Sequence, residues 1–220
     1  MLGFILSKLN LLILVTAIFA IIGFFTIGLT DITKVNEARE LAFKVKEKAF
    51  ALASAPGFCI SDSQVLPDEL IVAGGNFYYV MAVSKKELPD NVNLVIFSVY
   101  PRKDIEKYYA EGIEPNAIAA DSFRTKAEVK IYSYDYDGVS FGSAGTGIEE
   151  RTSLDEKSYI DPQAINYKNT IEIIKEVENG QPKLYILICT DAICKADKTT
   201  IGERDVHQVN AATGEGGFKC

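Results

Sequence analysis

A short acidic segment is the first place where this chain has residues suited to a metal ion. Asp135 and Asp137 alternate around Tyr136 and precede Gly138, a spacing that offers hard oxygen ligands to calcium. An EF-hand would need a further acid and a distal glutamate, and both are missing. Because Asp-Gly pairs are common in turns, the segment is predicted to be a turn, and no metal ligand is assigned.

A glycine-rich segment at residues 142–147 has the composition of a loop that wraps a phosphate group. Phosphate-binding loops of this type end in Lys followed by Ser or Thr, and they join a strand to a helix. Neither feature is present here. The sequence therefore predicts a surface loop and no bound cofactor.

The chain has one histidine, His207, in a polar stretch that also contains Glu203 and Asp205. A catalytic triad would need a nucleophile brought close by folding, and no Gly-x-Ser-x-Gly turn is present to supply one. The sequence favours a protein that is not an enzyme. An envelope enzyme that uses His207 is an alternative.

The four cysteines all follow residue 54, and they are candidates for two disulfides: Cys59, Cys189, Cys194 and Cys220. An even number on one side of a membrane anchor suits an oxidising compartment. Four cysteines allow three pairings, and the sequence does not choose among them. A zinc site is the alternative, but there is no Cys-x-x-Cys and His207 has no cysteine near it.

All of these residues follow an N-terminal segment that is predicted to be one long helix. Residues 9–30 are uncharged and almost wholly apolar, and about 20 such residues suffice to cross a bilayer. The run is longer than the apolar core of a cleaved signal peptide, and no Ala-x-Ala motif follows it. We therefore expect an uncleaved anchor in residues 1–30, which continues without proline into an amphipathic helix at residues 31–54.

The predicted helix at residues 31–54 carries two apolar stripes. The first repeats every three or four residues and suits packing against the protein's own domain: Ile32, Val35, Ala38, Leu41, Ala42, Val45, Ala49 and Leu52. The second contains Ile32, Phe43 and Phe50, about 100° around the helix, and it suggests contact with a neighbour. The alternative is that Phe43 and Phe50 broaden the first stripe. In the membrane segment, small residues at Thr16, Ala20 and Gly23 allow close helix approach.

Residues 55–220 are predicted to form one β-rich globular domain. Aromatic and β-branched runs predict strands at residues 77–83, 92–100, 126–136, 170–177 and 183–190. Asn179-Gly180 between the last two is a strong hairpin signal. A short helix is expected at residues 102–111, and residues 142–164 read as a loop or excursion. The fold class is therefore α+β, a long N-terminal helix packed on an antiparallel sheet of four to six strands.

The charge of the chain bears on its partners and on its orientation in a membrane. Residues 31–220 contain 22 basic and 30 acidic residues, a net charge of −8, which disfavours binding to nucleic acid. Five basic residues follow the apolar run within about 20 positions and only Lys8 precedes it, so the positive-inside rule opposes export of the domain. Long domains cross membranes largely regardless of charge, and the cysteines favour the outside. We expect an extracellular domain.

The order of apolar helix, amphipathic extension and antiparallel sheet with late cysteines resembles type IV pilins and archaeal prepilin-like proteins. The resemblance covers residues 1–54 well and the sheet in outline. It implies a structural subunit whose helix joins other pilin-like subunits in a filament core while the sheet domain covers the outside. Gly3-Phe4 is the junction most similar to a prepilin cleavage site, and Lys8 stands where the family has an acidic residue. The alternative is a membrane-tethered extracellular binding module that does not polymerise.

Overall fold

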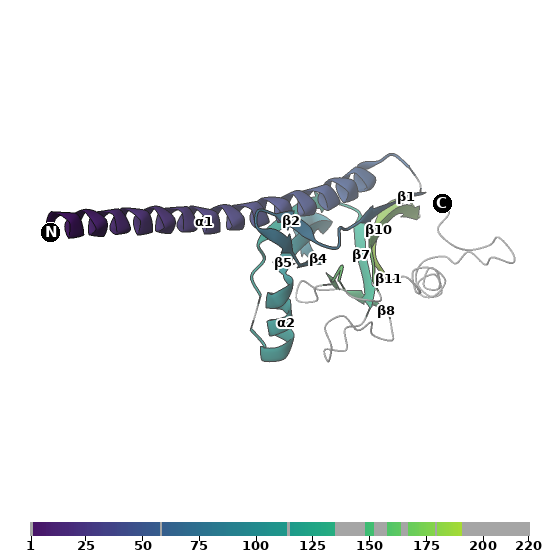
Figure 1. Ribbon diagram of the computed structural model, residues 1–220. Coiled ribbons are helices and arrows are strands. Elements are labelled where there is room, and N and C mark those ends of the chain that lie inside the picture. Colours follow the sequence, from purple (N-terminus) through teal and green to yellow (C-terminus); the bar gives the residue numbers. More distant parts are fainter. Residues whose placement is uncertain are drawn as a thin grey trace.

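The structure is a computed structural model that describes residues 2–57, 59–113, 115–134, 148–151, 158–163, 167–178 and 180–190. It has an α+β fold in which one long helix lies across β-sheets that are mostly antiparallel (Figure 1). The N-terminal half of the helix projects beyond the sheets (Figure 1). This arrangement confirms the predicted fold class.

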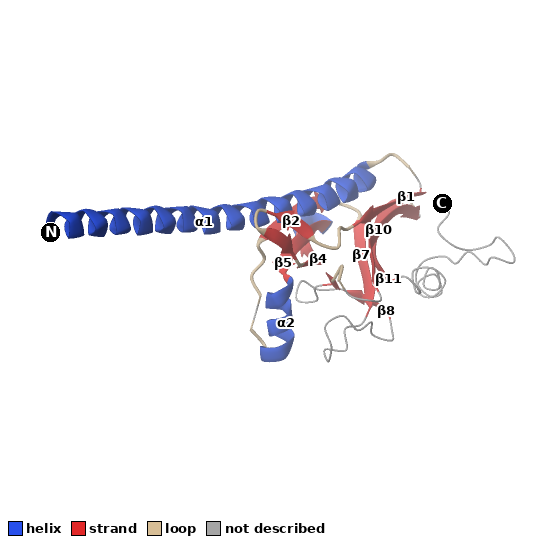
Figure 2. Cartoon of the chain, in the orientation of Figure 1, coloured by secondary structure: helices blue, strands red, loops and turns tan. Residues whose placement is uncertain are grey.

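Helix α1 runs over Leu2–Ser54, which is about 80 Å at 1.5 Å per residue. Figure 2 shows it as one uninterrupted helix, as the absence of proline predicts. It ends where the Ala55 amide donates to the Leu52 carbonyl (3.2 Å), just before Pro56 and Gly57. Proline after a last turn cannot continue a helix, so the observed end follows from the sequence.

A four-stranded antiparallel sheet has the order β6-β5-β4-β9. Its strands are β4 (Tyr79–Leu88), β5 (Val92–Pro101), β6 (Ala119–Thr125) and β9 (Ser158–Ile160). β4 and β5 are joined by a short 3-10 turn, Pro89–Asn91, in which Asp90 and Asn91 have positive φ angles of 65° and 55°. Strands β4 and β5 correspond to the predicted runs at 77–83 and 92–100, although β4 extends further to Leu88.

A five-stranded sheet has the order β1-β10-β11-β7-β8. Its strands are β1 (Cys59–Val65), β7 (Glu128–Tyr134), β8 (Ile148–Arg151), β10 (Tyr167–Glu178) and β11 (Gln181–Thr190). Strands β10 and β11 form the predicted Asn-Gly hairpin, with Glu178 paired to Gln181 and Gly180 at a φ of 80°. β11 pairs with β7 in parallel, so the expectation of a purely antiparallel domain is wrong at this position.

Two further differences from the sequence prediction concern the number of strands. The single expected sheet is divided into two, with a separate small hairpin of β2 Leu70–Val72 and β3 Gly75–Phe77. The segment 142–164, expected to be a loop, contributes the edge strands β8 and β9. Strands of three or four residues carry too little alternation to stand out from a loop, because periodicity needs a longer run.

Helix α2, Arg102–Glu111, is confirmed at its predicted bounds. It ends at Gly112, whose φ of 71° lies in the left-handed region and whose amide donates to the Tyr108 carbonyl (2.8 Å). Glycine adopts this conformation without a Cβ clash, which explains why the helix ends there. In Figure 1, α2 extends away from α1 at the end of the domain nearer the N-terminal half of α1.

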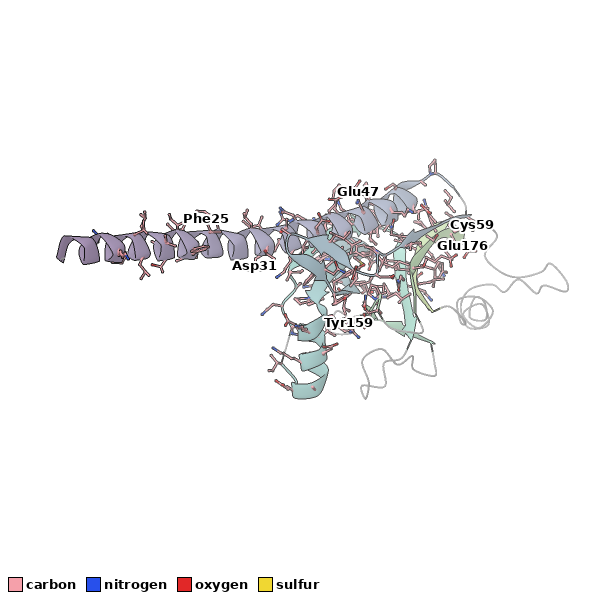
Figure 3. All side chains as sticks on the ribbon, viewed as in Figure 1. Phe25, Asp31, Glu47, Cys59, Tyr159 and Glu176 are labelled. Carbon is pink, nitrogen blue, oxygen red and sulfur yellow. The ribbon has the colours of Figure 1, made fainter. Side chains whose placement is uncertain are left out.

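The main core lies between the second half of α1 and the two larger sheets. Its largest fully buried side chains include Tyr79, Met81, Phe97 and Ile131. A smaller cluster of Val80, Ala82, Tyr100 and Ile105 packs α2 against the other face of β4 and β5. Figure 3 shows side chains filling the space between α1 and the strands.

Candidate interaction surfaces of the long helix

The second half of α1 buries one stripe against the domain. Six side chains are 0–7 % exposed: Ala38, Leu41, Ala42, Val45, Ala49 and Leu52. These are the i, i+3, i+4 positions that the sequence predicts, and among the described strands β6 contacts α1 most. Val35 is half-buried and Ile32 is 58 % exposed, so the packed stripe begins after Ile32.

The second stripe lies at the edge of this interface. Phe43 is 47 % exposed and Phe50 is 45 % exposed. Phe50 packs edge-to-face on Phe123 of β6, with ring centroids 6.0 Å apart. Phe43 has the Lys46 ammonium 4.4 Å from its ring centroid. Each ring thus keeps about half of its surface exposed. This geometry is compatible with both alternatives, in which the rings either contact a neighbouring molecule or broaden the stripe packed on the domain.

Charged side chains flank the two aromatic rings. Lys46 Nζ lies 2.8 Å from Glu47 and 3.5 Å from Asp121 of β6, which ties the helix to the sheet edge. The hydrogen bond to Glu47, followed by the attraction of Asp121, raises the pKa of Lys46 even though partial desolvation lowers it. On the outer side, the hydrogen bond and charge of Glu40, 2.6 Å away, raise the pKa of Lys44. The lysines therefore remain cationic at neutral pH.

The first half of α1 has no cover in the structure. Every described side chain at residues 10–29 is exposed, and the helix is long and apolar enough to cross a membrane. Figure 3 shows Phe25 on this projecting part and Asp31 close to where the helix reaches the domain. The Thr16 hydroxyl donates to the carbonyls of Leu12 and Ile13 (3.0 and 2.9 Å) and so needs no water. A Cβ added at Gly23 would meet nothing within 4 Å.

The five predicted assembly residues fall on two sides of α1. At 100° per residue, Thr16, Ala20 and Gly23 lie about 120–180° around the helix from Phe43 and Phe50. They share the side on which the stripe through Val45 meets the domain. The sequence pattern offered the five residues as one set of candidates, and the unbroken helix that it also predicted places them on two faces.

The structure locates two of the four cysteines. Cys59 begins β1 and is disulfide-bonded. Cys189 lies near the end of β11, and Cys194 and Cys220 lie outside the described residues. Cys59 pairs across the sheet with Glu176, which pairs with Lys183, whereas Cys189 is six residues further along β11. That separation is roughly 20 Å along the strand, far beyond the ~7 Å limit between disulfide-bonded Cα atoms. A bond between Cys59 and Cys189 is thereby excluded.

The remaining predicted sites are not described by the structure. The segment from Asp135 to Gly138, the glycine-rich residues 142–147 and His207 lie outside the described residues. Within the described ranges, no group of three or more His, Cys, Asp or Glu side chains is placed to hold a metal ion.

A buried ion pair that spacing alone did not predict joins α2 to the loop after β9. Asp161, 1 % exposed, accepts a hydrogen bond from Arg102 Nε (3.0 Å) and another from the Gln163 amide (3.0 Å). Burial raises the pKa of Asp161, and these two contacts only partly oppose it. The neighbouring Tyr79 hydroxyl donates to the Pro67 carbonyl (2.7 Å), and burial raises its pKa as well. The cluster fixes the loop after β9 against α2.

Comparison with known proteins finds no match: no family model, no curated protein and no solved structure is similar to this chain. The residues and the fold alone therefore carry the functional argument.

Proposed function

We propose that the protein is a pilin-like structural subunit, anchored in a membrane by residues 9–30 and assembled through α1 into a cell-surface filament. The observation that carries this proposal is the bare apolar half of α1. Twelve large apolar side chains between Leu11 and Leu29 are exposed. At about 1.5–3 kcal/mol each, their exposure to water would cost at most about 18–36 kcal/mol, more than a domain's usual net stability of about 5–15 kcal/mol. Lipid or neighbouring helices must cover them.

The two faces of α1 favour an open assembly over a closed dimer. A two-fold dimer uses one patch that complements itself, whereas contacts between two different patches generate rings or filaments. The small residues Thr16, Ala20 and Gly23 offer one patch for close helix approach. The half-exposed rings of Phe43 and Phe50 offer a second patch on another side of the helix.

An extracellular position for residues 55–220 is part of the proposal. The disulfide-bonded Cys59 suits an oxidising compartment, because cytosolic thiols are normally kept reduced. The basic residues after the anchor oppose export by the positive-inside rule, but that rule weakens for long exported domains. The partners in this account are the membrane and further pilin-like subunits, and no cofactor is assigned.

Electron microscopy of filaments from cells that express full-length variants tests the aromatic patch. We expect Phe43→Glu combined with Phe50→Glu to abolish filaments, because two carboxylates would then be buried between subunits. Ala51→Glu is the matched control, since Ala51 is exposed and lies about 80–100° around the helix from either ring. Filaments of normal number and length from the double variant would contradict the proposal.

The small-residue patch has its own test. Gly23→Leu should reduce filament number, since a bulky side chain prevents close approach of helices. Gly28→Leu is its control, because a Cβ at either glycine meets nothing within 4 Å and the two positions lie about 140° apart. Equal effects of the two changes would argue against the patch.

A membrane-tethered binding module is the second candidate, and one cavity favours it. An open cavity of ≈ 230 Å³ lies between α2 and the segment that leads to β6, lined by Asp104, Lys107, Ile113, Pro115 and Asn116. Typical ligand pockets are larger, about 300–1,000 Å³, so this cavity suits only a small ligand. Under this alternative the chain stays monomeric in membranes, and all four variants above leave its oligomeric state unchanged.

A further inference from the structure

The β2–β3 hairpin lies where the apolar run of α1 ends. Its two-residue turn, Ala73-Gly74, follows from the pairing of Val72 with Gly75. A Cβ added at Gly74 would lie 3.7 Å from the Oγ1 atom of Thr30, so the turn touches the helix at that residue. Counted from the N-terminus, Thr30 is also the first α1 residue whose described side chain is partly buried. The hairpin is therefore the domain element that meets α1 closest to the anchor.

Bilayer dimensions place this turn among the lipid headgroups. Residues 9–30 span about 33 Å at 1.5 Å per residue, and a hydrocarbon core is about 30 Å thick. Thr30 then lies at the hydrocarbon boundary, and the headgroup layer extends roughly 5–7 Å beyond it. A turn in contact with Thr30 lies in that layer whether the subunit functions as a filament precursor or as a tethered monomer.

The hairpin has the surface that such a position needs. Leu70 and Val72 are buried, whereas Ile71 between them is 79 % exposed, more than any other large apolar side chain described beyond α1. Ile71 is three residues from Gly74, which is at most about 10 Å along a strand. Residues 70–83 carry no charge, and the charged residues that adjoin the hairpin in the sequence are the acids Asp68 and Glu69. Contact with lipid would therefore be apolar and would not depend on anionic headgroups.

We infer that the β2–β3 hairpin is a second membrane contact, in which the turn lies in the headgroup layer and Ile71 packs against lipid. The inference rests on the proposed anchoring of residues 9–30. Together, the anchor and the hairpin define two points of attachment, which fixes how far the domain rotates about the axis of α1 while the subunit is in the membrane.

Tryptophan fluorescence in vesicles tests this contact, because the chain contains no tryptophan and a single substitution gives an unambiguous probe. Full-length Ile71→Trp, Val65→Trp and Phe24→Trp would be reconstituted in phosphatidylcholine vesicles that contain lipids brominated at known depths. Val65 is the matched control: it is an aliphatic β-strand residue, 65 % exposed, near Ser63, whose carbonyl accepts a hydrogen bond from Lys48 (2.7 Å). Lys48 lies about 27 Å along α1 from Thr30.

The expected result is a graded one. Phe24→Trp should be quenched most by bromines deep in the bilayer, and Ile71→Trp by bromines near the headgroups, with emission at shorter wavelength than Val65→Trp. Val65→Trp should be unquenched. Adding phosphatidylglycerol should leave the quenching of Ile71→Trp unchanged. Strong quenching of Phe24→Trp together with identical behaviour of Ile71→Trp and Val65→Trp would overturn the hairpin contact and leave the anchor intact. An unquenched Phe24→Trp would overturn both.

Discussion

Residues 10–29 and residues 38–52 belong to one continuous helix, yet the described side chains of the first segment are all exposed while six of the second are buried against the sheets. The backbone cannot account for the difference, because both segments satisfy their hydrogen bonds internally. The polar Thr16 hydroxyl donates to the Leu12 and Ile13 carbonyls one turn back, which suits a helix without access to water. One segment is therefore covered by the domain, whereas no described residue covers the other, which our proposal assigns to lipid or to other subunits.

Ala42→Asp should produce the largest effect of any single change in α1. Ala42 is 0 % exposed in the main core, so its carboxylate would be buried without a partner. We expect a loss of several kcal/mol, enough to unfold the domain. Chemical denaturation of the full chain in detergent measures this loss. The variant should still partition into membranes, because its anchor is unchanged, and failure to do so would mean that the two halves are not independent.

Ala20→Asp applies the same change to the other half. Ala20 is exposed in the apolar run, and a carboxylate at the centre of a membrane helix opposes insertion by about 2.5–3.5 kcal/mol. We expect reduced resistance to alkaline extraction from membranes and an unchanged free energy of domain unfolding in detergent. A domain destabilised as strongly as by Ala42→Asp would refute the division of α1 into two environments.

The pH should act on the domain and not on the anchor, because residues 9–30 contain no titratable side chain. Burial raises the folded-state pKa of Asp161 above its ordinary value of 3.8, so the folded state retains this proton more readily than the unfolded state. The resulting stabilisation is complete below pH ~3.8 and is lost as the pH rises through the folded pKa. The unfolding free energy of the wild type minus that of Asp161→Asn should therefore decrease between pH 4 and 7. A difference that increases with pH would contradict the assignment.

The Phe50–Phe123 contact should give the smallest measurable effect. Edge-to-face ring pairs contribute about 0.5–1.5 kcal/mol beyond their burial. A double-mutant cycle with Phe50→Leu and Phe123→Leu in detergent should show a coupling energy in this range. Phe43, whose ring contacts Lys46 of its own helix, should show no coupling to Phe123. No coupling for Phe50 either would make both rings available to neighbours, and a coupling well above the range would assign Phe50 to the core.

The elements that the sequence predicted are those whose signal is local. Residues 2–54 lack proline, and the repeat through Ala38, Ala42 and Val45 marks the buried face. Gly180 and Gly112, both with positive φ angles, set a turn and a helix end through their own backbone preferences. By contrast, β1 is half-exposed and polar at Ser61, Asp62 and Ser63, so burial does not impose an alternation that can be read from it.

Features that depend on distant segments were missed for a physical reason. The parallel pairing of β7 with β11 joins strands about 55 residues apart, and the division into two sheets depends on still more distant pairs such as β4 with β9 and β1 with β10. Asp161 and Arg102 are 59 residues apart in the sequence. No motif around either residue predicts that they form an ion pair.

Hydrogen–deuterium exchange of the full-length chain in lipid vesicles, read by mass spectrometry, tests the two-environment account of α1 most directly. The account predicts slow exchange for amides of both residues 10–29 and residues 38–52 in the wild type. In Ala42→Asp, residues 38–52 should exchange rapidly while residues 10–29 stay protected by lipid. Rapid exchange of residues 10–29 in the wild type, or loss of protection in both segments together in the variant, would contradict it.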